Sequence, residues 1–363
     1  MCASFLTWTF FSNDRNTRQA TPFSVIKNVV IIGGGSVGTP TAKQLSQYHA
    51  ILVAPRSAFL HLPAMVRTTT TSIGQLEDRA LWKLARENKY GTVVSFTASP
   101  VSGEEDAKED STGGAAQRGE VTLDSGEVIP YAALILTTGS LWEGPLEIPV
   151  SSSVIKQHLS WWRNRFEKAN SIVLICGGSI SAEYTGEIRQ FYPATEITIV
   201  PGGRLPLNAS YPDKFRSRDQ ITLHADLVVP TRGGWPNTEF IKSSLGESAL
   251  TATGHVKVLP TFQLPNYPCV FAGGDITDLN EQKQAAKALG HASIIFSNVQ
   301  LVLEGKTSTK LYKGATEAIL ITLGMGGISY IGILWGIILG GWFTGFIKSK
   351  GLLINMVKGQ LGL

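Results

Sequence analysis

Near the start of the chain, a short apolar run leads directly into a glycine-rich turn, Asn28-Val29-Val30-Ile31-Ile32-Gly33-Gly34-Gly35-Ser36-Val37-Gly38. Continuous apolar runs of this length are typical of strands that are buried in a parallel sheet. We expect a helix over residues 39–48 and a second short strand over residues 51–54. Together these elements predict the opening βαβ unit of a Rossmann-like α/β domain.

The spacing of the glycines suits a dinucleotide pyrophosphate. Gly33 permits a tight turn, Gly35 lets the backbone approach the phosphates, and Gly38 lets the helix pack closely on the strand. The amino end of the helix then offers N–H groups and a positive dipole end to the anion. We take as candidate binding residues Gly33, Gly34, Gly35, Ser36, Val37 and Gly38. The alternative is a glycine-rich turn with a structural role only.

One expected part of this site is missing. An acidic residue about 20 positions after the turn normally binds the ribose hydroxyls. The second strand here ends Ala54-Pro55-Arg56, and the sequence has no Asp or Glu between Asp14 and Glu77. Either the ribose is held in another way, or the cofactor binds more weakly than is typical.

A second apolar strand and glycine turn follow at Ser171-Ile172-Val173-Leu174-Ile175-Cys176-Gly177-Gly178-Ser179-Ile180-Ser181-Ala182-Glu183. A chain with two dinucleotide folds suggests one bound flavin and one visiting nicotinamide nucleotide. The first turn is intact, whereas the second is altered.

Composition narrows the class of protein. The 363 residues can form two or three domains, and 43% hydrophobic with 17% charged residues fits a globular protein. A net charge of +4, spread along the chain, does not indicate a nucleic-acid partner. The three cysteines form no CxxC pair, so a disulfide-relay reductase is not expected. We expect residues 1–27 to form a flexible extension; a mitochondrial presequence is the alternative.

The chain resembles the apoptosis-inducing-factor-like group of flavoproteins, which includes the ferroptosis suppressor protein. The motifs that carry the resemblance occur in the same order: Gly33-Gly34-Gly35, Ser57 to Arg67, Thr138-Gly139-Ser140, Gly186-Glu187-Ile188, Tyr211-Pro212-Asp213-Lys214, Ala225-Asp226-Leu227-Val228, Pro236-Asn237-Thr238, Gly274-Asp275 and Lys283-Gln284-Ala285-Ala286. Members of this group look like pyridine nucleotide-disulfide oxidoreductases without the redox disulfide.

The resemblance implies a glutathione-reductase-like α/β fold with two Rossmann-like domains. The FAD-binding domain would be discontinuous, over residues 28–150 and 262–305. A shortened NAD(P)H-binding domain would occupy residues 151–261, and a small, apolar α+β module residues 306–363.

By the same resemblance, five further residues lie at the flavin. Arg67 matches a flavin-binding arginine, and its alternative is an ordinary exposed arginine. Thr138 and Gly139 match a loop that passes beside the cofactor, and Asp275 matches an aspartate near the ribityl–pyrophosphate region. Lys283 would begin a helix that points at the isoalloxazine and would favour the anionic reduced flavin; the alternative is a solvated helix charge.

The second turn departs from the pattern GxGxxGxE that the resemblance implies. Gly177, Gly178 and Glu183 are the candidate NAD(P)H-binding residues. Cys176 and Ser181 stand where the pattern has glycine, and cysteine adopts a positive φ less readily than glycine. Arg204 would favour NADPH as a weak signal. By comparison with the group, several tens of residues are absent around residues 216–224.

A long uncharged segment, residues 318–347, contains eight glycines. We expect it to form a buried or interface module with a hairpin whose strands are 319–323 and 328–333. A membrane span and a shallow membrane contact are the alternatives.

These observations favour an FAD-dependent oxidoreductase that passes electrons from NADH or NADPH to a quinone-like acceptor. No metal site is expected. One rival is a flavin-binding protein with little NAD(P)H turnover, and the other is a membrane-anchored accessory protein. The expected location is cytoplasmic or mitochondrial, with membrane association as an option.

Overall fold

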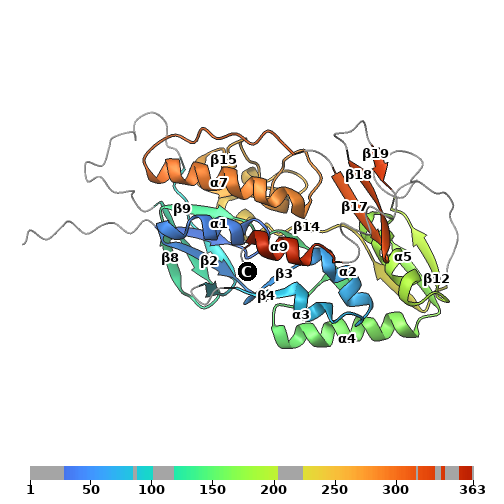
Figure 1. Cartoon of the computed structure of the whole chain (residues 1–363). Helices are drawn as coiled ribbons and strands as arrows, with labels where there is room; N and C mark the ends of the chain where they lie inside the picture. Colours follow the sequence, from blue (N-terminus) through green and yellow to red (C-terminus); the bar gives the residue numbers. More distant parts are fainter. Residues whose placement is uncertain are drawn as a thin grey trace, which may run out of the picture.

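The computed structural model describes residues 28–84, 88–100, 118–202, 224–315, 318–331, 337–339 and 351–361 (Figure 1). Several predictions lie outside these residues, namely the flexible extension over 1–27, Arg204, the motif 211–214 and the part of the apolar segment that lies within 340–350. The limits of the domains stay predictions.

A six-stranded sheet forms the first unit, in the order β15-β16-β9-β1-β2-β5. Strand β1 (Val29–Ile32) pairs in parallel with β2 (Ala50–Ala54) and β9 (Ala133–Leu136). Strand β16 (Tyr267–Ala272) pairs in parallel with β9, although more than 100 residues separate them. The sheet is completed by β5 (Lys89–Tyr90) and β15 (Gln263–Leu264). The expected discontinuous first domain is therefore confirmed.

Both faces of this sheet are covered, which explains its continuous apolar strands. Val29 and Ile31 face a core shared with α7 (Ala288–Leu303), which packs against α1 (Gly38–Gln44) (Figure 1). Val30 and Ile32 face a second core, shared with a three-stranded antiparallel sheet of β6 (Val93–Phe96), β7 (Gly119–Leu123) and β8 (Val128–Tyr131). The predicted helix over 39–48 is divided into α1 and a 3₁₀ turn, Ser46–Tyr48.

The second unit is a smaller parallel sheet in the order β12-β11-β13. Strand β11 (Ser171–Ile175) lies between β12 (Glu196–Val200) and β13 (Leu227–Pro230). Helix α4 (Ser152–Lys168) leads into β11, and α5 (Ser179–Phe191) follows the second glycine turn. Only three strands of this sheet fall within the described residues, in keeping with the predicted shortened domain.

Smaller elements link the two units. Helix α2 (Leu62–Thr70) packs against both α4 and α5. Strand β10 (Ser140–Leu141), after β9, pairs with β14 (Trp235–Pro236), after β13. The carboxyl ends of the two sheets therefore meet at one junction. Four further short elements are β3 (Ala58–Leu60), β4 (Leu81–Lys83), α3 (Leu76–Ala80) and α6 (Glu239–Leu245).

The C-terminal part adds a sheet and a helix. The hairpin of β17 (Ala318–Leu323) and β18 (Gly326–Ile331), with β19 (Ile337–Leu339) beside it, packs on α5 (Figure 1). The predicted hairpin is confirmed: its turn is Gly324-Met325, and Gly324 has a φ of +62°. Helix α9 (Ile354–Leu361) returns to the main core. In the portion of the chain that the structure covers, no helix has the length and apolar character needed to span a bilayer.

Candidate cofactor sites

The first glycine turn needs glycine at its two ends for steric reasons. Gly33 has a φ of +113°, and a Cβ there would lie 2.3 Å from the Thr137 carbonyl oxygen. A Cβ on Gly38 would lie 1.9 Å from the Gly33 carbonyl oxygen. Both contacts are far below van der Waals distance, so the roles expected for these two glycines agree with the structure.

The middle of the turn is open. A Cβ built on Gly35 meets nothing within 4 Å, and Gly35 is exposed. The turn lies between the carboxyl end of β1 and the start of α1, where this class of fold binds a pyrophosphate. Ser36 is half-buried and Val37 is buried beneath the turn. The space above Gly35 is therefore open, as the expected binding of a diphosphate requires.

Thr137, at the end of β9, fixes the shape of the turn. Its hydroxyl donates to the carbonyl oxygens of Ile32 at 2.9 Å and Gly33 at 3.0 Å. The contact joins residues 104 or more positions apart, so no local pattern indicates it.

Two further predicted flavin residues lie in the loop after β9. The Thr138 hydroxyl donates to the carbonyl oxygen of Asn237 at 2.7 Å, and the Asn237 N–H donates to the carbonyl oxygen of Gly139 at 3.0 Å. Gly139 has a φ of +67°. These bonds connect the loop to the segment that follows β14.

The loop after β16 meets the first glycine turn. The Gly273 N–H donates to the Leu136 carbonyl oxygen at 2.9 Å, and a Cβ on Gly274 would lie 3.2 Å from a methyl group of Val37. The half-buried Asp275 accepts a hydrogen bond from the Ser140 hydroxyl at 2.8 Å. The structure therefore brings together three predicted segments, 33–38, 138–140 and 273–275, at the carboxyl ends of β1, β9 and β16.

The end of β2 offers no carboxylate, as the sequence indicates. Arg56 donates from Nε to the Pro149 carbonyl oxygen at 3.1 Å and also to the Ile148 carbonyl oxygen. Burial lowers the pKa of the Arg56 guanidinium. Arg56 thus ties the end of β2 to the segment before α4.

Arg67 is buried, so the alternative of an exposed surface arginine is wrong. Its guanidinium makes two hydrogen bonds to the carboxylate of Glu187 on α5, at 2.7 and 2.9 Å. It also donates to the Gly324 carbonyl oxygen in the C-terminal hairpin, at 2.7 Å. Arg67 therefore joins α2, α5 and the hairpin, and its contact with a flavin stays a prediction.

Lys283 does not begin a helix, which corrects the sequence expectation. A 3₁₀ turn, Ala285–Lys287, precedes α7, which begins at Ala288. The Lys283 ammonium donates to the carbonyl oxygens of Thr277 at 2.8 Å and Leu279 at 3.0 Å. Partial burial lowers its pKa, against the opposing effect of Glu281 and other nearby carboxylates. Its role in tuning a flavin stays a prediction.

The second glycine turn carries the strain that the sequence predicts. Cys176 has a φ of +80°, in the region that favours glycine. Ser181 is fully buried, and its hydroxyl has no hydrogen-bond partner among the described residues. Gly177 is half-buried, and a Cβ on Gly178 meets nothing within 4 Å, so the middle of this turn is also open.

Glu183 lies on the buried side of α5, facing the C-terminal hairpin. Its carboxylate accepts a hydrogen bond from the Thr322 N–H at 3.2 Å. A Cβ on Gly186 would lie 2.2 Å from the Cα of Leu323, so the hairpin packs directly on the backbone of α5. Part of the acceptor capacity of Glu183 is thus used within the protein.

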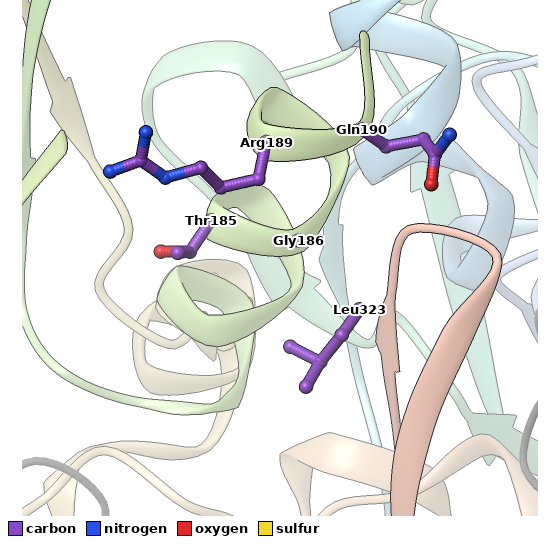
Figure 2. Close-up of a pocket in the computed structure, with 5 residues that line it drawn as sticks. All are labelled: Thr185, Gly186, Arg189, Gln190 and Leu323. Carbon is purple, nitrogen blue, oxygen red and sulfur yellow. The ribbon is translucent and has the colours of Figure 1, made fainter. Parts of the chain in front are cut away.

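A hollow of about 340 Å³ lies along this contact, near the carboxyl end of α5. Figure 2 shows Arg189 and Thr185 on one side of the helix, and Leu323 of the hairpin and Gln190 on the other. It is an open groove remote from the glycine turn that precedes α5, so we assign no ligand to it.

Two parallel βαβ units, each with an open glycine turn, define the class of oxidoreductases with two dinucleotide-binding domains. The family model for pyridine nucleotide-disulphide oxidoreductases matches residues 27–218, which is just over half of the chain. The chain belongs to the pyridine nucleotide-disulphide oxidoreductase family. FAD and NAD(P)H are the cofactors of that family.

Known proteins agree with this assignment. The chain is 37% identical to the FAD-dependent oxidoreductase FVFD30 of Flammulina velutipes, over 79% of this chain and 97% of that protein. It is 27% identical to apoptosis-inducing factor homolog B of Dictyostelium discoideum, over 92% and 97%, respectively. The sulfide:quinone oxidoreductase of Aquifex aeolicus superposes with a TM-score of 0.63 at 14% identity, over 93% of this chain and 92% of that structure. The resemblance to the apoptosis-inducing-factor-like group is confirmed.

The Dictyostelium match also bears on the length of the chain. It extends over 399 aligned positions but includes 92% of the 363 residues, or about 334 residues. About 65 aligned positions therefore have no residue of this chain opposite them. This total includes every gap in the alignment, so a deletion around residues 216–224 stays a prediction.

Proposed function

We propose that this chain takes electrons from NADH or NADPH onto FAD and passes them to a quinone-like acceptor. The observation that carries the proposal is the pair of open glycine turns, over Gly35 and Gly178, on two parallel sheets of one chain. When bound, FAD would supply the redox chemistry: it accepts a hydride and then donates electrons onward.

The protein's own residues would position the cofactor. Backbone groups of residues 33–38 would hold the diphosphate, with Thr137 fixing the turn. Thr138, Gly139 and Asp275 would border the cofactor from the two adjacent loops. The pairing of β10 with β14 supports the transfer step, because it joins the carboxyl ends of the two sheets.

The nicotinamide nucleotide would bind over Gly177 and Gly178 at the start of α5. The quinone-like acceptor is supported by the likeness of this fold to the sulfide:quinone oxidoreductase. A cytoplasmic or mitochondrial location, and membrane-surface contact through 318–347, remain predictions. The described strands of that segment support the hairpin module over a helical span.

Anaerobic mixing of the purified protein with NADH and with NADPH tests the proposal. The flavin band at about 450 nm should bleach with at least one nucleotide, and added menadione should restore it. A protein that carries FAD but does not bleach with either nucleotide would contradict electron entry from NAD(P)H.

A flavin-binding protein with little NAD(P)H turnover is the second candidate. It is favoured by the positive φ of Cys176, the buried Ser181 hydroxyl and the contact of Glu183 with the hairpin. Bound FAD without bleaching would select this candidate in the same experiment.

A further inference from the structure

A cluster of buried polar side chains lies behind the loop at residues 273–275. The carboxylate of Glu281 is at its centre, and the side chains of Glu281, Lys287 and His291 are each less than 10% exposed. The Glu281 carboxylate accepts from His291 Nε2 at 2.9 Å and from the Tyr312 hydroxyl at 2.9 Å. The Lys287 ammonium lies 3.5 Å from the same carboxylate.

The contacts of His291 determine which ring nitrogen carries the proton. The Gly274 N–H donates to His291 Nδ1 at 3.1 Å, so Nδ1 must be an acceptor. The proton of the neutral ring is therefore on Nε2, from which it is donated to Glu281. A second proton on Nδ1 would face the Gly274 N–H, and two donors cannot share that contact.

The ring has little freedom to move away. Phe262 and Tyr312 pack against it, with ring centroids 4.7 and 4.8 Å from that of His291. The loop is equally confined, because a Cβ on Gly273 would lie 2.6 Å from Ile295 of α7 and 3.1 Å from Val37. The loop at residues 273–275 is thus packed tightly between α7 and the first glycine turn. Loss of the hydrogen bond at Gly274 would therefore disturb this packed loop.

We propose that neutral His291 is a positioning residue of the flavin site. Its Nδ1 accepts the hydrogen bond of the Gly274 N–H and so keeps Asp275 in place against Ser140. Protonation of Nδ1 removes this acceptor. This inference rests on the proposed binding of FAD at the first glycine turn. It gives FAD affinity a dependence on pH that originates outside the residues bordering the cofactor.

The charges around His291 define the direction of the effect. Burial lowers the pKa of His291 from its ordinary value of 6.5, whereas the carboxylates of Glu281 and Asp275 raise it and the ammonium of Lys283 lowers it. Burial is the largest of these effects, so the neutral form of His291 is favoured and the ring takes up a proton only on the acid side of its ordinary range. Because FAD would bind the neutral form, its affinity should fall with decreasing pH, by up to roughly tenfold per pH unit.

The experiment is a titration of the apoprotein with FAD from about pH 8 to about pH 5, followed by flavin fluorescence. The wild-type dissociation constant should rise toward the acid end of this range, with a slope of up to roughly tenfold per pH unit. His291→Asn places an amide oxygen near the position of Nδ1 without a titrating group, so its dissociation constant should stay nearly constant with pH. Glu281→Gln removes the charge that raises the His291 pKa, so the transition should move to lower pH.

His255→Asn is the matched control. His255 adjoins Val256, whose N–H donates to the Ile276 carbonyl oxygen. His255 also interacts electrostatically with Asp275, but its ring bonds to Thr253. Its pH profile should equal that of the wild type. A flat wild-type profile, or the wild-type profile retained in His291→Asn, would overturn the inference.

Two results keep this test separate from that of the proposed function. Failure of the wild type to bind FAD at about pH 8 would reject the flavin site itself. If His291→Asn does not fold, Glu281→Gln decides: an unshifted transition, with the Gly274 amide equally protected from hydrogen exchange at both ends of the pH range, would overturn the role of His291.

Discussion

The hydroxyl of Thr231 donates a hydrogen bond to the carbonyl oxygen of Cys176, the first position of the second glycine turn, at 3.0 Å. It also donates to the Ile175 carbonyl oxygen at 2.7 Å. Thr137 makes the same two contacts in the first unit, with Ile32 and Gly33. Each turn is thus held by a threonine at the end of the strand that flanks it, so the two units share this construction although their turn sequences differ.

Replacing either threonine by valine should loosen its turn. The change removes the hydroxyl donor from two carbonyl oxygens, which are buried at Ile32 and partly buried at Gly33, Ile175 and Cys176, and we expect a loss of about 0.5–1.5 kcal/mol in the free energy of unfolding. Thr137→Ser and Thr231→Ser keep the hydroxyl and should cost less. Urea titration of the apoprotein measures the difference; valine variants as stable as the serine variants would show that these hydroxyls do not hold the turns.

Cys176→Gly should be more stable than Cys176→Ala. Both variants remove the thiol, but alanine keeps a Cβ at a φ of +80°, which costs roughly 1 kcal/mol relative to glycine in this region. Thermal unfolding of the two apoproteins under the same conditions provides the comparison. An alanine variant equal to or more stable than the glycine variant would disprove the strain.

Ser181→Ala should stabilise the protein. The change removes a fully buried hydroxyl that lacks a partner among the described residues, and such a group costs about 1–3 kcal/mol. Ser297→Ala, where the hydroxyl bonds to the Ser293 carbonyl oxygen at an exposed position, should change stability by less than about 0.5 kcal/mol. Urea unfolding distinguishes the two variants, and a destabilised Ser181→Ala protein would contradict the assignment.

Arg67 and Glu187 form a buried pair whose disruption should be costly. Arg67→Ala or Glu187→Ala leaves a buried charge without its bidentate partner, with an expected loss of about 3–5 kcal/mol. Arg163→Ala is the control, because it disrupts a bidentate pair with Glu77 whose side chains are more exposed. Unfolding of the apoproteins separates this structural role from any loss of flavin; similar costs at Arg67 and Arg163 would count against it.

The first unit is largely predictable from sequence because its signals are local. The apolar run, the glycine spacing and the following helix all lie within residues 28–48, and they predict the turn and its place in the fold. The strain at Cys176 follows from the same local reasoning, because a glycine turn specifies the φ of each position.

The other features of the candidate sites depend on contacts between residues that are distant in the sequence. The bond between Arg67 and Glu187 joins positions 120 apart, and His291 reaches back 17 residues to Gly274. Neither has a characteristic spacing. The resemblance implies a helix that begins at Lys283, whereas the backbone first forms a 3₁₀ turn over Ala285–Lys287 and α7 begins at Ala288.

The central claim is that FAD binds over the first glycine turn, and Gly35→Ala tests it most directly. A Cβ at Gly35 meets nothing within 4 Å, so the apoprotein should unfold as the wild type does, while the added methyl group occupies the space of the diphosphate. We expect FAD affinity to fall by roughly tenfold or more, whereas Gly178→Ala, which is equally open in the second turn, should leave FAD affinity unchanged. A Gly35→Ala protein that binds FAD as tightly as the wild type would contradict the account.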